Sequence, residues 1–197
     1  MDDNYIIEML HITKEFPGIL ANDDVTLQLK KGEIHALLGE NATALGIGMV
    51  HQHFKLVDIF SVIDNIILGA EPARYGFLTK AEARKKVMAL SEKYGLKVDP
   101  DAKIEDITVG MQQRVEILKM LYRDNEILIF DEPTAVLTPQ EIDELMGIMK
   151  ELAKEGKSIL FITHKLNEIM AVADRCTVLR KGKYIGTVDV KNTTKEQ

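Results

Sequence analysis

Cysteine is almost absent from this chain of 197 residues, in which Cys176 is the single example. One cysteine cannot form an internal disulfide, so a reducing cytosolic compartment is expected. Long apolar runs are also absent, as is the charged-then-apolar layout of a signal peptide. We therefore expect no membrane-spanning segment here, and any role at a membrane would be peripheral and act through a partner.

Basic residues are fewer than acidic ones, 25 against 31, and the formal net charge at pH 7 is −6. Binding along a nucleic-acid backbone requires a basic surface, so this charge argues against nucleic acid as a general partner. Internal repeats and low-complexity tracts are lacking as well. A chain of this length can bury a real core as one domain, or as one domain with a small appendage.

The most informative stretch is a short apolar run that ends in two carboxylates. Residues 127–130 are Ile-Leu-Ile-Phe, and Asp131 and Glu132 follow. Four apolar residues suit a strand buried on both faces and are too few for a helix. Ligands of open parallel sheets collect beyond the carboxyl ends of the strands, so Asp131 is a candidate Mg²⁺ ligand and Glu132 a candidate general base. Alternatively, the pair only solvates the end of a strand.

Two further apolar runs also end in polar residues. Residues 158–163 precede His164, and residues 33–38 precede the Gly-Glu-Asn sequence at 39–41. Three buried strands that deliver polar residues at their carboxyl ends would turn one edge of a parallel sheet into a site.

The pattern is interrupted after Asn41. Gly39-Glu40-Asn41 fits the start of a phosphate-binding loop, but no Gly-Lys-Ser/Thr follows. A crossover helix is missing too. A βαβ unit takes roughly 30 residues or more, and no room for its helix exists between residues 41 and 47. We expect that the natural polypeptide carries a segment between Asn41 and Ala42 that these 197 residues omit. A genuine deletion is the alternative, and it would disrupt the fold.

Gln52 lies in a short extended piece, between His51 and His53. Two histidines spaced by two on a strand could face one way and hold a metal, but no cysteine or carboxylate cluster completes a ligand set. Ordinary strand-end histidines are therefore preferred. Gln52 is a neutral side chain that can contact both a cation and a water.

Residues from Ser61 to about Val109 have a helical pattern. Ser61 and Thr79 each begin a capping box, and Gly95 ends the second predicted helix. Thr108 is a candidate N-cap of a further helix, whose open N–H groups would favour an anion; a plain capped helix fits equally well.

The two ends of the chain complete the predicted layout. Residues 5–16 and 25–30 read as strands of a small antiparallel layer. Thr138, Pro139 and Glu141 form a capping signature for a helix that runs to Gly156. A short helix over 166–173 and a hairpin over 177–188 should follow, with a polar, frayed tail at 189–197.

At these residues the chain resembles the nucleotide-binding subunit of ABC transporters, more narrowly the first ATP-binding cassette of importers for simple sugars and nucleosides. Residues 107–114 resemble the ABC signature in degenerate form, 127–132 Walker B, 49–54 the Q-loop and 161–164 the switch histidine. Phe16 falls where the family stacks an aromatic ring on adenine. The match covers nearly the whole chain in the right order.

The resemblance implies an α/β fold, with a P-loop NTPase-like, mostly parallel core, an N-terminal antiparallel β layer and an inserted helical subdomain. One nucleotide-binding domain would span 1–197, with 1–60 and 110–197 as its core and 61–109 as the helical subdomain. The implied cofactors are ATP and Mg²⁺.

The resemblance also implies roles for single residues. Glu132, His164 and Gln52 would act in catalysis, and Asp131 and Gln52 would hold Mg²⁺. Contacts to this cassette's own ATP are implied for Phe16, Gly39, Glu40 and Asn41. Contacts to the ATP of a facing cassette are implied for Thr108, Val109, Gly110, Met111 and Gln112.

The implied function is ATP hydrolysis that energises import of a sugar or nucleoside, and the His-Gln-His-Phe form of the Q-loop leans weakly toward nucleosides. Implied partners are a second cassette on the same or a fused chain, transmembrane permease subunits, and indirectly a solute-binding protein. The location would be the cytoplasmic face of the cell membrane.

The chain departs from the family pattern in three places. The Walker A lysine and Ser/Thr have no counterpart, the signature has Val109 for glycine and Met111 for glutamine, and residues 135–138 lack the aspartate of the D-loop. Two rivals therefore remain, a soluble ABC-type ATPase outside transport and a non-catalytic interaction domain that has lost its phosphate-binding loop.

The intact mass of the natural polypeptide tests the interruption after Asn41. If a phosphate-binding segment is omitted from these 197 residues, mass spectrometry should give a value above 22.2 kDa. A mass equal to that of the 197 residues would establish a true deletion, and sequencing the encoding DNA between Asn41 and Ala42 would locate any difference.

Overall fold

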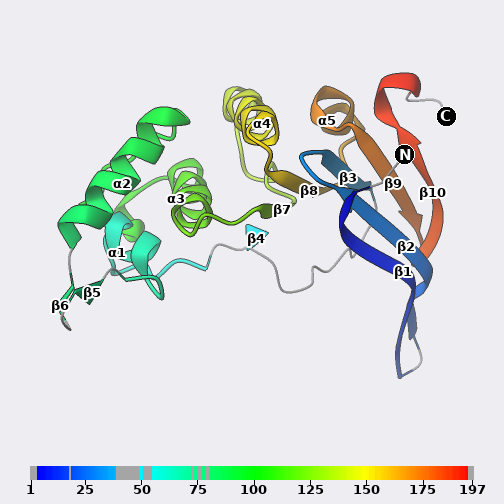
Figure 1. The fold of residues 1–197 in the computed structure, drawn as a ribbon, viewed down its shortest axis with the longest axis horizontal. Coiled ribbons are helices and arrows are strands. Elements are labelled where there is room, and N and C mark those ends of the chain that lie inside the picture. Colours follow the sequence, from blue (N-terminus) through cyan, green and yellow to red (C-terminus); the bar gives the residue numbers. More distant parts are fainter. Residues whose placement is uncertain are drawn as a thin grey trace. The chain divides into compact units, whose positions relative to one another are not determined.

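The computed structural model describes residues 4–17, 19–38, 49, 50, 55–71, 73, 74, 77, 78 and 80–194. They fall into two compact units, the first within 1–49, 126–132 and 142–197 and the second within 50–125 and 133–141. A large sheet organises the first unit, whereas helices dominate the second (Figure 1). Within the described part of the chain, no helix has the length and apolar character needed to cross a membrane.

The large sheet has eight strands in the order β1-β2-β10-β9-β3-β8-β7-β4. Neighbours among β9, β3, β8 and β7 are parallel, whereas β1 with β2 and β9 with β10 are antiparallel. The predicted α/β fold with a parallel core and an N-terminal antiparallel layer is confirmed, and the layer is continuous with the core. The strands are β1 (Tyr5–Phe16), β2 (Ile19–Lys30), β3 (Ile34–Leu38), β4 (Met49–Val50), β7 (Ile127–Asp131), β8 (Ser158–Thr163), β9 (Arg175–Arg180) and β10 (Lys183–Asp189).

Strands β3, β7 and β8 are buried because most of their side chains are apolar on both faces of the sheet. Every residue of β8 is buried, and Phe130 and Phe161, which are register partners, have no exposed surface. Burying a side chain of this size stabilises a fold by roughly 1.5–3 kcal/mol. Figure 1 shows the helices α4 (Pro139–Lys154) and α5 (Leu166–Val172) on one side of these strands.

Strand β2 has the predicted alternation of a half-buried strand. Val25, Leu27 and Leu29 are buried, whereas the residues between them are only partly so. Leu27 belongs to a core cluster with Leu37 and Ile129, so the antiparallel layer shares the core of the parallel strands.

The predicted frayed tail is wrong for its first residues. Asp189 caps a short 3₁₀ turn, η2 (Val190–Asn192), by accepting a hydrogen bond from the N–H of Lys191. Val190 is only 5% exposed. The N–H of Val190 also donates to the carbonyl of Asp174 at 3.0 Å. Burial and this hydrogen bond together anchor the turn, which composition alone did not reveal.

The second unit contains the helices α1 (Val62–Ile67), α2 (Lys80–Lys93) and α3 (Val109–Tyr122), the short hairpin β5 (Ala73–Arg74) and β6 (Phe77–Leu78), and the 3₁₀ turn η1 (Ile104–Asp106). Ser61 caps α1 as predicted, whereas the Thr79 capping box lies partly outside the described residues. The segment 94–103 is irregular rather than helical, because Gly95 ends α2 with a φ of 67° and Pro100 follows.

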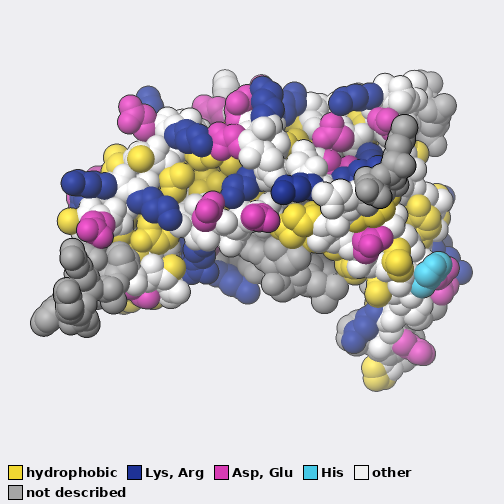
Figure 2. Space-filling view, in the orientation of Figure 1, with side chains coloured by type: hydrophobic (Ala, Val, Ile, Leu, Met, Phe, Trp, Pro, Cys, Tyr) yellow, Lys and Arg dark blue, Asp and Glu magenta, His cyan; other side chains and the backbone are white. Residues whose placement is uncertain are grey.

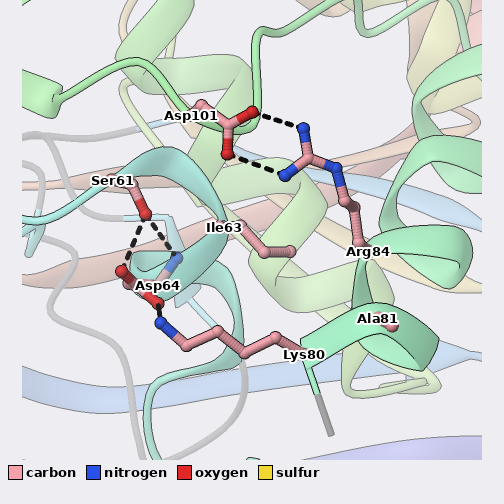
Figure 3. Close-up of a pocket in the computed structure, with 7 residues that line it drawn as sticks. All are labelled: Ser61, Ile63, Asp64, Lys80, Ala81, Arg84 and Asp101. Atoms are coloured by element: carbon pink, nitrogen blue, oxygen red, sulfur yellow. Dashed lines mark hydrogen bonds and ion pairs between the residues drawn. The ribbon is translucent and has the colours of Figure 1, made fainter.

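Two ion pairs join α1, α2 and the following loop (Figure 3). Lys80 lies 2.6 Å from a carboxylate oxygen of Asp64, and Arg84 binds Asp101 through both of its terminal nitrogens. The hydrogen bond from Lys80 is the main cause that lowers the pKa of Asp64. Figure 2 shows basic and acidic side chains side by side over α2, so this surface carries both signs of charge.

A buried polar network supports β3. The ring of His35, which is fully buried, contacts Thr177 at 2.8 Å and the carboxylate of Glu33 at 3.3 Å. Glu33 also accepts from the backbone N–H of Lys30 and from Arg175. Burial alone would raise the pKa of Glu33, but the hydrogen bonds from His35 and Lys30 and the charge of Arg175 outweigh it and lower that pKa.

Replacement of Glu33 should therefore weaken the fold in a pH-dependent way. A carboxyl group whose pKa is lowered by folding stabilises the native state above its unfolded pKa, near 4.5, and that contribution is lost as the pH falls through its lower folded pKa. Glu33→Gln should reduce the free energy of unfolding by about 1–3 kcal/mol at pH 7 and flatten its fall below pH 4.5. Urea denaturation between pH 3 and 7 measures both effects. Glu8→Gln, at an exposed position of β1, is the control, and equal acid sensitivity of the Glu33 variant and the parent would contradict the assignment.

Candidate functional site

The three strands that were predicted to share one edge end side by side. Leu38 is the register partner of Thr163, and Asp131 is the partner of Ile162. The backbone N–H of Glu132 donates to the carbonyl of Ile162 at 2.9 Å and extends the ladder by one bond. The carboxyl ends of β3, β8 and β7 therefore form one edge of the sheet, where ligands of open parallel sheets collect.

At this edge Glu132 and His164 are in contact. The Nδ1 atom of His164 lies 3.0 Å from Oε1 of Glu132, and the two side chains are 58% and 28% exposed. A histidine in this position can donate to the carboxylate or, when protonated, pair with its charge. The pair is thus accessible to a ligand, and the chain keeps a carboxylate and an imidazole together where a water could be activated.

Glu132 has an unusual backbone. Its φ is 45°, in the left-handed region that a residue with a Cβ enters at a cost of roughly 1–2 kcal/mol. The hydrogen bond to Ile162 fixes this conformation at the end of β7. Strain of this kind is typical of sites where a side chain must be held in one direction.

The position of His164 depends on residues that sequence reasoning missed. The Thr163 hydroxyl donates to the buried carboxylate of Glu168 at 3.2 Å and accepts from the N–H of Lys165 at 3.1 Å. Lys165 in turn pairs with Glu168 at 3.3 Å. These bonds fix the turn that carries His164, and a glutamate in the first turn of a short helix gave no signal of this role.

Asp131 ends β7 and is partly buried, beside Glu132. In the described part of the chain, no group of three or more histidine, cysteine or acidic side chains could hold a metal. Mg²⁺ nevertheless commonly takes one or two protein carboxylates together with phosphate oxygens and water. Asp131 offers one such carboxylate at this edge of the sheet.

The start of α3 belongs to the second unit. Thr108 is the N-cap as predicted, because its hydroxyl accepts from the N–H of Met111 at 3.3 Å. The side chain of Gln112 is directed backward and donates to the carbonyl of Ile104, and Val109 is 45% exposed. The five predicted signature residues, 108–112, thus lie together at the start of one helix.

Gly110 is approached closely by Glu141, a contact that the sequence did not indicate. A Cβ atom built on Gly110 would overlap Oε1 of Glu141. Glu141 is the capping-box residue of α4 and accepts from both the N–H and the hydroxyl of Thr138 at 2.9 Å. The first turn of α3, for which an anion site and a plain capped helix were both open, has the carboxylate of Glu141 beside it.

Other predicted residues lie outside the described part of the chain, namely Gly39, Glu40, Asn41 and Gln52. Phe16 ends β1, and only its backbone is described.

Comparison with known proteins explains why these motifs occur together. The family model described as "ABC transporter" matches residues 42–135. The nucleoside import ATP-binding protein NupA of Lactococcus lactis subsp. cremoris (strain MG1363) is 54% identical over all of this chain and 46% of its own length. The guanosine import ATP-binding protein NupO of Bacillus subtilis (strain 168) is 55% identical over 98% of this chain and 45% of its own length.

The chain belongs to the ABC transporter family.

The chain spans less than half the length of these curated ABC relatives. The alignment with NupA extends over 233 positions although this chain has 197 residues, so NupA has positions without a counterpart here. The family match begins at Ala42, directly after the interrupted phosphate-binding loop.

Solved ABC cassettes share the fold. The structure of cbiO1 from Clostridium perfringens, part of the ABC transporter complex cbiONQ, has a TM-score of 0.80 at 24% identity and covers 95% of this chain and 90% of its own. The dimeric bacterial ABC transporter cassette MJ0796 has a TM-score of 0.79 at 22% identity and covers 94% of this chain and 99% of its own.

The close approach of Glu141 to Gly110 predicts the effect of a single methyl group. In Gly110→Ala the new Cβ would occupy the place of a Glu141 carboxylate oxygen, so that side chain must leave Thr138. The hydrogen bonds from Thr138, and the charge of Arg114, lower the pKa of Glu141, and in the variant it should rise toward its ordinary value of 4.5. Titration of the carboxyl carbon by NMR measures this pKa.

Gly147→Ala provides the matched control, since a Cβ there would meet nothing within 4 Å. It should leave the pKa of Glu141 unchanged and, as alanine is the better helix former, stabilise α4 by about 0.5–1 kcal/mol. If Glu141 titrates identically in the parent and in Gly110→Ala, the carboxylate does not lie against this glycine in solution.

Proposed function

We propose that this chain is the ATP-binding and ATP-hydrolysing domain of an importer for a nucleoside or sugar. The observation that carries the proposal is the contact between Glu132 and His164 at the carboxyl edge of the sheet, directly after Asp131, in a chain of the ABC family. A nucleoside is favoured over a sugar, because the relatives named for nucleoside and guanosine import are 54–55% identical, whereas a ribose import protein of Burkholderia ambifaria is 40% identical.

Each residue of the edge has a chemical role in this proposal. Asp131 would hold Mg²⁺ through its carboxylate, and Gln52 would complete the contacts to the metal and a water. Mg²⁺ bound with the nucleotide supplies neutralisation of phosphate charge. Glu132 would accept a proton from the attacking water, and His164 would hold Glu132 in position and reach toward the terminal phosphate. Positioning and charge stabilisation account for most of phosphoryl-transfer catalysis, and these side chains supply both.

The phosphate-binding half of the site is incomplete in the 197 residues. The lysine and Ser/Thr of a phosphate-binding loop have no counterpart after Asn41. The longer alignment with NupA, and a family match that begins at Ala42, support a segment missing between Asn41 and Ala42. The full polypeptide would then carry the loop. A non-catalytic interaction domain is the rival function, and it applies if the gene lacks this segment.

The proposed partners follow from the same reading. A second cassette would face the start of α3, so that residues 108–112 contact the nucleotide bound by that cassette. Transmembrane permease subunits would contact the helical subdomain at 61–109, and a solute-binding protein would act through them. The whole assembly would lie at the cytoplasmic face of the cell membrane, with this chain as a peripheral subunit.

Replacement of the proposed base tests the function. In the full-length protein produced from its gene, Glu132→Gln should lower ATP hydrolysis by about 10²–10⁴-fold, because the amide cannot accept the proton. Binding of ATP should persist, since the amide keeps the shape and one acceptor oxygen. Phosphate release and equilibrium binding of a fluorescent ATP analogue measure the two properties separately.

Glu151→Gln, at an exposed position of α4 and away from the edge, is the control and should hydrolyse ATP at the parental rate. Undiminished hydrolysis by Glu132→Gln would refute the assigned base. A full-length parent that binds no ATP would instead identify the non-catalytic interaction domain.

A further inference from the structure

The backbone of Lys55 is held by two side chains of α3. Its N–H donates to Oε1 of Glu116 at 3.0 Å, and its carbonyl accepts from Nζ of Lys119 at 3.3 Å. Glu116 and Lys119 are one turn apart, and their charged groups are 4.0 Å from each other. Both polar groups of one residue are thus bound by an acid and a base on the same helix.

Val57 is held in the same way from α1. Its N–H donates to Oδ1 of Asn65 at 2.7 Å, and its carbonyl accepts from Nδ2 of the same side chain at 3.1 Å. Asn65 is fully buried and donates its second amide hydrogen to Ser61. The segment 55–57 has no regular secondary structure, yet side chains of two helices bind it as a neighbouring strand would.

Burial makes these contacts costly to break. Glu116 is only 5% exposed, and a buried carboxylate needs hydrogen bonds and a neighbouring positive charge to be tolerated. Lys55 and Lys119 supply them. Gln113 lies one turn before Glu116 on α3, is 2% exposed, and has no hydrogen-bond partner in the described part of the chain for either amide atom. This face of α3 is therefore unusually polar for a buried surface.

Predicted site residues lie close in the sequence both to the segment 55–57 and to the helix that binds it. Lys55 follows Gln52 by three positions, and α3 begins with the signature residues 108–112. Both lie in the second unit, in which α1 and α3 pack together (Figure 1).

We propose that Glu116, Lys119 and Asn65 are positioning residues that fasten the segment 55–57 to α1 and α3 and thereby restrict the position of Gln52, the residue assigned to Mg²⁺ and water. The effect on catalysis rests on the function proposed above, whereas the fastening itself does not.

Hydrogen exchange of single amides, followed by NMR on the full-length protein produced from its gene, tests the fastening. In Glu116→Ala the Lys55 amide should exchange at least tenfold faster, while the Val57 amide, held by Asn65, keeps its parental rate. Glu116→Gln retains an acceptor oxygen and should restore most of the protection. Lys119→Met should weaken protection of Lys55 too, and it serves if Glu116→Ala does not fold.

Glu92→Ala removes an exposed glutamate of α2 and should change neither amide. Parental exchange at Lys55 in both Glu116→Ala and Lys119→Met would overturn the proposal.

Kinetics of the full-length protein test the positioning. Glu116→Ala should lower kcat for ATP hydrolysis at least tenfold and leave KM for ATP within twofold, and Glu116→Gln should recover most of kcat. A parental kcat in Glu116→Ala, in a protein that Glu132→Gln inactivates, would overturn the positioning role alone. Hydrolysis that survives Glu132→Gln would refute the assigned base, whereas a full-length parent that binds no ATP would show that the proposed function is wrong. The exchange data would decide the fastening in either case.

Discussion

The parallel hydrogen-bond ladder between β3, β8 and β7 is the constraint on which the rest of this structure depends. Its register sets Leu38 beside Thr163 and Asp131 beside Ile162, so the three strands end together. A slip of one residue would turn every side chain of a strand to the opposite face and separate Glu132 from His164. Close packing on both faces opposes such a slip, because it would exchange side chains of different size between tightly packed positions.

The candidate site uses that rigid edge to hold Glu132 and the turn that carries His164 in fixed conformations. Glu132 keeps a left-handed backbone, and the turn after β8 is braced by the buried carboxylate of Glu168. In the second unit, side chains rather than a sheet edge fix an irregular segment. Glu116 and Asn65 bind backbone groups there that no neighbouring strand binds. In both units, buried polar side chains fix the segments that adjoin the predicted site residues.

Local patterns predicted most of the fold. The apolar runs of β3, β7 and β8, the alternation in β2 and the caps at Ser61, Thr108 and Thr138 all have causes within a few residues, and the structure has them. The helix end at Gly95 was also predicted, but the broad helical pattern up to Val109 missed the irregular segment 94–103. The turn at Val190 was expected to fray, whereas burial of Val190 and its hydrogen bond to Asp174 hold it.

By itself the sequence determined the strands, the helix caps and the polar residues at the strand ends, because spacing and turn chemistry act between near neighbours. Only the tertiary structure decided that His164 touches Glu132, that Glu141 lies against Gly110 and that Glu116 holds Lys55. In each of these contacts the partners are tens of residues apart in the chain. Their meeting is set by packing and register, which no local pattern encodes.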